Sequence, residues 1–147
     1  MLDIENIFET ISMIRDENLD IRTVTMGISL HDCVSDDIGR LCDNIYDKIT
    51  HAAEKLVPTA NDIEKQYGIP IINKRVSVTP VSLIGGKADP DSYVKIAKTL
   101  DRAAETLGIN FIGGFGALVQ KGMTRSAERL MEAIPQALSE TKMVCSS

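Results

Sequence analysis

Apolar residues recur at two different spacings in the first part of the chain, and each spacing predicts one type of element. Residues 3–17 place isoleucine and phenylalanine at helical intervals, so we expect an amphipathic helix there. Residues 19–30 alternate apolar with small or polar side chains, which is the pattern of a strand. A long apolar stripe then predicts a second helix, capped by Ser35 and ended before Pro58.

The middle of the chain continues this alternation. A shorter helix is expected from Thr59 to Gly68, where glycine suits a left-handed cap. Residues 69–86 are rich in β-branched side chains and predict the second strand region. Pro80 lies in the middle of this region and predicts a bend, a bulge or an edge position, so we expect the strand to be irregular.

The clearest helix signals lie in the second half of the chain. Asp89 is a favourable N-cap, Pro90 follows at the first helical position, and Gly108 is a typical stop. The stretch 109–114 then predicts a short third strand.

The last part of the chain predicts one more helix and one more strand. Thr124 opens a helix that Pro135 breaks or restarts, and residues 142–147 form the fourth strand. Strands that alternate with helices indicate right-handed βαβ crossovers and a mainly parallel sheet. We therefore predict an α/β fold in which residues 1–147 form a single unit, either a small open sheet or half of an α/β barrel.

Parallel strands end at the same edge of a sheet, and α/β proteins place their ligands at that edge. The loops after the predicted strands bring polar, reactive and backbone-exposing residues there. The candidate site residues are Asp32 and Cys33 after the first strand, Gly85, Gly86 and Lys87 after the second, Gly113, Gly114, Gly116 and Lys121 after the third, and Cys145 in the fourth.

Three of these residues are candidates for catalysis, and each has a plainer interpretation. A helix N-terminus beside Cys33 would lower its pKa and make it a nucleophile, whereas a small buried thiol would be inert. Asp32 is either a reactive carboxylate or a cap of the next helix. Cys145 is either an inert strand end or a reactive group at the edge of the sheet.

The stretch HDCVSDD, residues 31–37, combines imidazole, thiol and carboxylate groups, which are ligands of transition metals. The other histidine, His51, falls in the middle of a predicted helix, and the spacing matches no closed metal site. We therefore predict no metal.

The stretch FIGGFGALVQKG, residues 111–122, has two interpretations. It is either a tight turn packed against a neighbour, or a site where backbone amides and Lys121 bind an anion. No P-loop pattern is present, and Val119 replaces the third glycine of a dinucleotide fingerprint, so no cofactor is assigned. Lys74 and Arg75 also interrupt an apolar strand; they either line a cavity and bind a carboxylate or phosphate, or face solvent.

Composition and charge narrow the classes of function. The chain is 44% apolar and 25% charged, as expected for a soluble globular protein, and no apolar run approaches the length of a membrane span. Its first residues are acidic and helical in pattern, so we expect no signal peptide and a cytoplasmic protein. The three cysteines are widely spaced, so we expect reduced thiols.

The net charge of −5 argues against a nucleic-acid partner, but the charge is unevenly distributed. Residues 1–70 hold six basic and 14 acidic side chains, a net charge of −8, whereas residues 71–147 hold ten and seven, a net charge of +3. A small anionic ligand is therefore expected in the second half.

Several longer stretches are distinctive: DIRTVTMGISLHDC, GIPIINKRVSVTPVSLIGG, LGINFIGGFGALVQKGMT and VCSS. Together they resemble the uncharacterised protein family 0210, also called domain of unknown function 711, over essentially the whole chain. The resemblance implies a fold like that of pyruvate-formate-lyase-type proteins, a ten-stranded α/β barrel made of two five-stranded parallel halves. It also implies a homodimer, and it implies no activity because none is established for the family.

Members of this family continue beyond the VCSS strand, so the resemblance implies that the chain is the N-terminal fragment of a longer barrel protein. Its last strand would then be an unprotected edge, and its partner would be the remainder of the barrel or a second copy. Glycyl radical enzymes of this fold use a C-terminal glycine loop and a cysteine on an inner loop. The chain contains neither region, so those roles are not transferred to Gly113 or Cys145.

Three functions remain open after this reasoning. The chain is an enzyme or enzyme half that acts on a small anionic metabolite at the strand ends. Alternatively, it is a non-catalytic binding, regulatory or structural protein. The third interpretation is a fragment without independent function.

Overall fold

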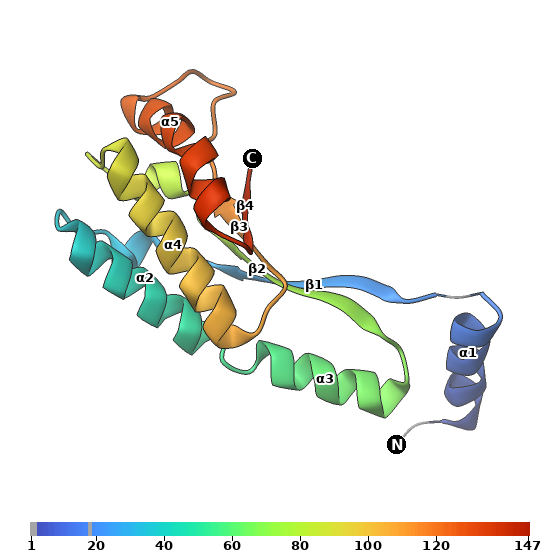
Figure 1. Cartoon of the computed structure of the whole chain (residues 1–147). Coiled ribbons are helices and arrows are strands. Elements are labelled where there is room, and N and C mark those ends of the chain that lie inside the picture. Colours follow the sequence, from blue (N-terminus) through green and yellow to red (C-terminus); the bar gives the residue numbers. More distant parts are fainter. Residues whose placement is uncertain (1–2, 18) are drawn as a thin grey trace.

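Four parallel strands form the sheet in the computed structural model, which describes residues 3–17 and 19–147 (Figure 1). The strands follow one another across the sheet in chain order, and each neighbouring pair is parallel. They are β1 (Ile21–Ile28), β2 (Ile71–Val78), β3 (Phe111–Phe115) and β4 (Val144–Ser146). The predicted α/β fold with parallel strands alternating with helices is therefore confirmed, although β1 and β2 are shorter than expected.

Helices occupy the connections between the strands. Along the chain they are α1 (Ile4–Arg15), α2 (Ile38–Ala52), α3 (Leu56–Tyr67), α4 (Pro90–Leu107) and α5 (Arg125–Glu140), with short 3₁₀ turns η1 (His31–Cys33) and η2 (Val81–Leu83) at the strand ends. Helices α2, α4 and α5 lie side by side over the sheet, whereas α1 stands apart beside the start of β1 (Figure 1).

The expected caps fix the helix ends with one exception. The Asp89 carboxylate accepts the N–H of Ser92 at 2.8 Å, and Gly108 ends α4 with a φ of 70°. The cap of α2 is Asp37 and not the expected Ser35, because the Asp37 carboxylate accepts the N–H of Arg40 at 2.8 Å. A cap must sit directly before the first helical residue, and α2 begins two residues later than the sequence pattern suggested.

The predictions made for three prolines are met only in part. Helix α2 ends at Ala52, before Pro58 as predicted, but Pro58 lies in the first turn of α3, where a backbone N–H has no helical acceptor, so α3 begins at Leu56 and not at Thr59. Pro80 follows β2 and precedes η2, so it does not interrupt the strand. Pro135 lies inside a continuous α5, which packing of the opposite face on the sheet maintains despite the lost hydrogen bond.

The core lies between the sheet and the helices. Apolar side chains from one face of each strand meet apolar stripes of the helices, and the fully buried members include Leu41, Ile45, Ile49, Val76, Ile96, Leu100, Ile112 and Leu130. The strands bury alternate residues, so their remaining side chains project from the opposite face.

Helix α1 forms as predicted but takes no part in this core. None of its residues, all of which are described, is buried. Ile4 is 68% exposed and Phe8 is 67% exposed, so the apolar side of the helix faces away from the rest of the chain.

Candidate functional site

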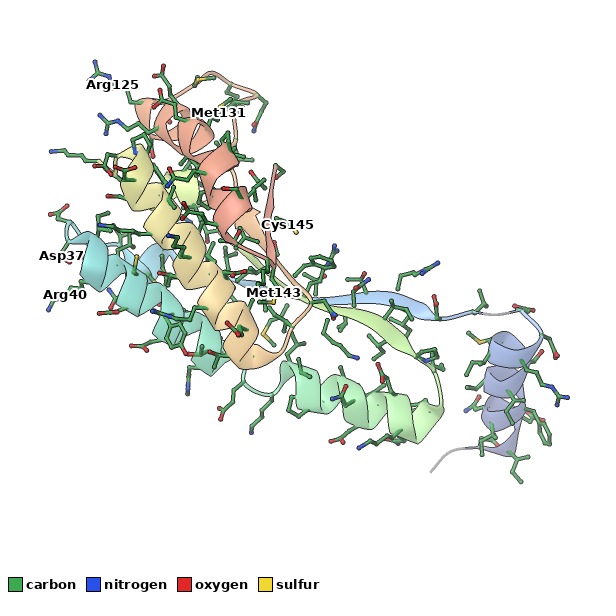
Figure 2. The ribbon with its side chains drawn as sticks, in the orientation of Figure 1. Asp37, Arg40, Arg125, Met131, Met143 and Cys145 are labelled. Atoms are coloured by element: carbon green, nitrogen blue, oxygen red, sulfur yellow. The ribbon has the colours of Figure 1, made fainter. Side chains whose placement is uncertain are left out.

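Within residues 3–17 and 19–147, no helix covers one face of the sheet, and most side chains on that face are polar or small. Thr25 and Ser77 project from the face opposite to the buried Val76, and Arg75 does so as well. Cys145 is exposed and lies on the side of β4 away from α5 (Figure 2). Strands β1, β2 and β4 therefore present polar or small side chains on the same uncovered face, and β3 adds the apolar side chain of Phe111.

One row of residues crosses this face in register. Gly27 pairs with Ser77, Ser77 pairs with Gly113, and Gly113 pairs with Cys145, so each strand contributes one small residue. A Cβ atom at Gly27 or Gly113 would meet no other atom of the described residues within 4 Å. The backbone of this row is therefore accessible from the uncovered face, and the Cys145 thiol lies at the end of the row.

A depression of about 280 Å³ lies over part of this row. It is lined by Thr25, Arg75, Val76, Ser77, Phe111, Gly113, Gly114, Cys145 and Ser147. Arg75 is the only charged side chain among these described residues, and its Nε donates to the Thr25 hydroxyl at 3.5 Å. None of the four ion pairs in residues 3–17 and 19–147 includes Arg75, so its charge is available to a ligand.

Lys74 is adjacent to Arg75 in sequence but lies on the helical side. Its Nζ is 2.6 Å from Oε1 of Glu64 in α3, and the same oxygen accepts the N–H of Ile71 at 3.0 Å. The bond from Lys74, then the bond from Ile71, hold the pKa of Glu64 below its usual value. Lys74 is therefore engaged in an ion pair that joins α3 to β2.

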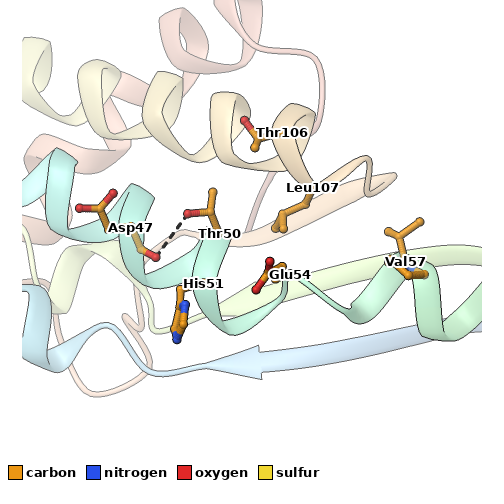
Figure 3. A pocket seen from close by; sticks show the side chains of 8 residues that line it. Asp47, Thr50, His51, Glu54, Val57, Thr106 and Leu107 are labelled. Atoms are coloured by element: carbon orange, nitrogen blue, oxygen red, sulfur yellow. Dashed lines mark hydrogen bonds between the residues drawn. The ribbon is translucent and has the colours of Figure 1, made fainter.

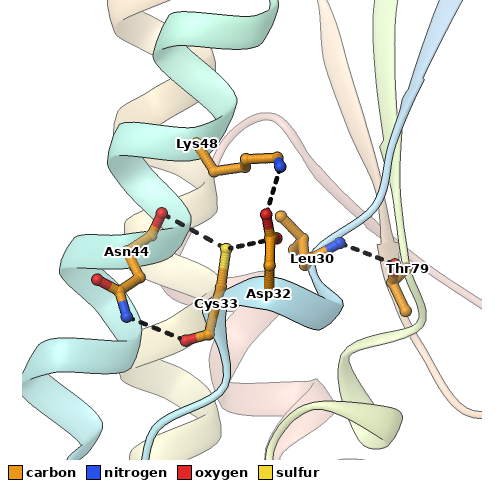
Figure 4. A network of polar contacts seen from close by, with 6 residues as sticks. All are labelled: Leu30, Asp32, Cys33, Asn44, Lys48 and Thr79. Carbon is orange, nitrogen blue, oxygen red and sulfur yellow. Dashed lines mark hydrogen bonds and ion pairs between the residues drawn. The ribbon is translucent and has the colours of Figure 1, made fainter.

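The loop after β1 forms a closed polar network (Figure 4). The Lys48 Nζ donates to Oδ2 of Asp32 at 2.6 Å, which lowers the pKa of Asp32 and raises that of Lys48. Cys33 is buried, and its Sγ lies 3.7 Å from Oδ1 of Asp32 and 3.6 Å from the carbonyl oxygen of Asn44. Burial, followed by the neighbouring Asp32 carboxylate, raises the pKa of the Cys33 thiol to about 11.

Nucleophilic catalysis requires a lowered thiol pKa, because the thiolate is the reactive form. The raised pKa of Cys33 is opposite to this requirement. Cys33 is therefore protonated at neutral pH and serves as a small core residue. Asp32 caps no helix: its carboxylate pairs with Lys48, and Asp37 caps α2 instead.

The glycines after β2 and β3 are enclosed more tightly than the open row. A Cβ at Gly85 would lie about 2.5 Å from the Tyr93 ring. Gly114 has a φ of 116°, and a Cβ there would lie 2.6 Å from the carbonyl oxygen of Val78. The carbonyl oxygen of Gly116 accepts the N–H of Ser82 at 3.3 Å. These contacts are those of tight turns packed against neighbours.

The remaining candidates are dispersed. Gly85, Gly86 and Lys87 line a second hollow of about 370 Å³, which shares no lining residue with the depression on the uncovered face. Lys87 is exposed, and its backbone oxygen accepts from Arg129 at 3.1 Å. Lys121 lies in the exposed loop before α5. The uncovered face thus brings together Arg75, Gly113, Gly114 and Cys145 from the candidate set.

Sequence reasoning missed Thr25, Ser77 and Phe111 as lining residues. The signal was present in the alternation of β1 and β2, because Thr25 and Ser77 occupy the positions between buried apolar side chains. A polar strand face usually contacts solvent, so this alternation does not by itself indicate a binding site.

A larger hollow lies in the helical layer, between the ends of α2 and α4 and the start of α3 (Figure 3). It measures about 820 Å³ and is lined by Asp47, Thr50, His51, Glu54, Val57, Pro58, Thr106 and Leu107. His51 lies in the last turn of α2, not in its middle as expected. Within residues 3–17 and 19–147 no group of three histidine, cysteine or acidic side chains is placed to hold a metal ion.

Comparison with known proteins places the chain in a family. Residues 12–147 match the model of the family described as Uncharacterised ACR (DUF711).

Among the described residues, no helix has the length and apolar character needed to cross a membrane.

Similar proteins named UPF0210 protein occur in several bacteria. The one from Ruminiclostridium cellulolyticum is 58% identical over 147 residues, which is 100% of this chain and 32% of the relative. The one from Campylobacter concisus is 60% identical over 146 residues, 99% of this chain and 33% of the relative. The chain therefore spans about a third of the length of the curated relatives it matches, and it belongs to the uncharacterised UPF0210 (DUF711) family.

Proposed function

We propose that the uncovered face of the sheet is part of the wall of a polar cavity that binds a small anionic metabolite. All-parallel sheets are normally covered on both faces, so a bare face on such a sheet calls for a further layer. An apolar layer would not suit Arg75 and Ser77, because burial of unpaired polar groups is costly. A cavity filled by water and a polar ligand does suit them.

The rest of this cavity would come from additional chain. Parallel strands with helices on one side have the arrangement of a barrel wall, in which the inner face encloses the ligand. The relatives are about three times as long as this chain, since it covers 32% of one of them, and that length would supply the other wall. On this proposal the chain is part of a half-barrel of the pyruvate-formate-lyase-like type.

The observation that carries the ligand class is the position of Arg75. Its guanidinium has no carboxylate partner among the described residues and stands beside the open backbone of Gly113. A guanidinium binds carboxylate and phosphate oxygens through parallel hydrogen bonds. The hydroxyl groups of Thr25 and Ser77 add donors at the same place. The depression of about 280 Å³ is suited to a small metabolite.

Ligand binding is tested by thermal unfolding with small carboxylates, inorganic phosphate and sugar phosphates. At a concentration one hundred times its Kd, a ligand stabilises a protein by about 2.7 kcal/mol, which a melting curve resolves. Arg75→Ala removes the proposed binding group. Arg40→Ala is the matched control, since Arg40 is also exposed but lies on α2 (Figure 2).

A ligand that stabilises the wild type and Arg40→Ala but not Arg75→Ala supports the proposal. The proposal fails if no compound stabilises either the chain or the full-length Ruminiclostridium cellulolyticum relative. It fails equally if Arg75→Ala responds as strongly as the wild type.

A second candidate function is binding without catalysis. The groups whose pKa is shifted, among them Asp32, Cys33, Glu64 and Tyr93, belong to ion pairs or to the helical core and not to the depression. Shifted acid and base groups often mark catalytic sites, so their location favours a binding role for this segment.

Mass spectrometry of a stabilising compound after incubation with the full-length relative separates the two functions. Conversion of the compound identifies an enzyme, and Cys145→Ser, made in this chain and at the same strand of the relative, shows whether the thiol takes part. Stable binding without conversion identifies a binding protein.

A further inference from the structure

Helix α1 presents an apolar stripe that its own chain leaves uncovered. Ile4, Ile7, Phe8 and Ile11 follow the i, i+3, i+4, i+7 spacing of one helix face, and between 41% and 68% of each is exposed. A helix of 12 residues is only marginally stable in water without such a face being buried. The stripe therefore requires a surface to cover it.

The same chain contains an open apolar groove of about 200 Å³ between α3 and β1. It is lined by Val24, Met26, Lys55, Leu56, Thr59, Ala60, Ile63 and Ile71. Leu56, Thr59, Ala60 and Ile63 recur about once per turn on one side of α3, so the groove runs lengthwise along that helix. It occupies the place beside α3 where a further helix would cover the edge strand β1.

We propose that α1 of one copy docks into this groove of a second copy, and that the second copy returns the contact. Such an exchange covers both apolar surfaces and gives a symmetric dimer with two identical contacts. Helices α1 and α3 both have 12 residues, so each is about 18 Å long and they match in length.

Helix α1 does not occupy the groove of its own chain, because none of its residues lines that groove. The N–H of Leu19 donates to the carbonyl oxygen of Met13 at 2.8 Å, and the N–H of Ile21 donates to that of Pro70 at 3.0 Å. The first bond joins Leu19 to the last turns of α1, and the second joins the start of β1 to the residue before β2. The helix projects beside the start of β1, apart from the other helices (Figure 1).

Charge favours the groove over a pairing of two α1 helices. The described part of the first segment, residues 3–17, holds Asp3, Glu5, Glu9, Asp16 and Glu17 against a single arginine, a net charge of −4. Two such helices packed together would repel each other. The only charged side chain lining the groove, among the described residues, is Lys55, so the groove has the complementary sign.

Chemical cross-linking between two differently tagged chains tests which surface α1 meets. One chain carries Phe8→Cys and the other Ile63→Cys, both at exposed positions, and Cys145→Ser removes the exposed native thiol. A short bismaleimide then joins the two chains if α1 of one lies in the groove of the other. A matched chain with Leu83→Cys, also exposed but in η2 after the end of β2, measures random cross-linking.

A mixed product well above the Leu83→Cys level supports the proposal. Three results overturn it: cross-linking only between two Phe8→Cys chains, cross-linking only within a chain that carries both cysteines, or no product above the control. Sedimentation gives an independent check, because Phe8→Glu and Ile63→Glu should each weaken dimerisation by about tenfold or more, and Leu83→Glu should not. A chain that sediments as a monomer at all concentrations also overturns the proposal.

Discussion

Lys74 and Arg75 are adjacent in the sequence but serve opposite faces of β2. The Lys74 ammonium lies 2.6 Å from the Glu64 carboxylate beneath α3, whereas the Arg75 guanidinium reaches the Thr25 hydroxyl on the uncovered face. One positive charge thus joins the helical layer to the sheet, and its neighbour remains available to a ligand. Strand alternation is the cause, because successive side chains point to opposite faces.

The ion pair between Lys74 and Glu64 predicts a pH-dependent stability. The folded pKa of Glu64 lies below its usual value of 4.5, so the pair stabilises the fold above that pH. The contribution is lost as the pH falls through the folded pKa, where the carboxylate becomes protonated. We expect Glu64→Gln to lower the melting temperature at pH 7, and the difference from the wild type to shrink as the pH falls below 4.5.

Melting curves between pH 7 and pH 3 measure this difference. Glu105→Gln is the matched control, because Glu105 is exposed on α4 and belongs to none of the ion pairs in the described residues. A difference between Glu64→Gln and the wild type that stays constant over this range would contradict the ion-pair explanation.

The three cysteines should differ sharply in reactivity. Cys33 and Cys42 are buried and Cys145 is exposed. The raised pKa of Cys33, about 11, leaves almost no thiolate at pH 8. We expect a thiol reagent to modify one cysteine rapidly in the folded chain and all three after denaturation, and Cys145→Ser to remove the rapid phase. A rapid phase that survives in Cys145→Ser would show that Cys33 or Cys42 is accessible.

The sequence predicted those features that depend on neighbouring residues. Asp89 and Gly108 bounded α4 correctly because a cap acts within a few residues of its own helix. The sequence did not predict which face of the sheet the helices cover, because alternation defines two faces but does not distinguish the covered one. That question decided the roles of Lys74 and Arg75, and it required the arrangement of α3 against β2.

The local sequence pattern also did not predict whether single side chains are buried. Cys33 follows a strand like the other candidates and had two interpretations; the inert buried thiol is confirmed, because α2 packs over it and burial raises its pKa. The apolar stripe of α1 was read correctly, but a stripe predicts only that a covering surface exists, not that the same chain supplies it.

Pro135 and Pro58, which lie at different positions in their helices, predict different results when each is replaced by alanine. Pro135 lies in the interior of α5 at an exposed position, where it removes one backbone hydrogen bond. We expect Pro135→Ala to stabilise the fold by about 1 to 3 kcal/mol. Pro58 lies in the first turn of α3, where its missing N–H would have no helical acceptor, so Pro58→Ala should change stability by less than about 1 kcal/mol. Denaturant unfolding measures both, and equal effects would contradict the argument from position.

Gly113 and Gly114 separate the stability of the fold from the proposed binding site, although they are neighbours in β3. Gly114 has a φ of 116° and lies against Val78, so we expect Gly114→Ala to destabilise the fold by about 1 to 3 kcal/mol or more. Gly113 has open space at its Cβ position, so Gly113→Ala should leave the melting temperature nearly unchanged. Its methyl group would nevertheless stand in the depression beside Arg75 and reduce stabilisation by a bound anion. Melting curves with and without a stabilising carboxylate or phosphate measure both effects. If Gly113→Ala binds such a ligand as well as the wild type, the ligand lies elsewhere, because a methyl group at residue 113 would clash with a molecule bound in the depression.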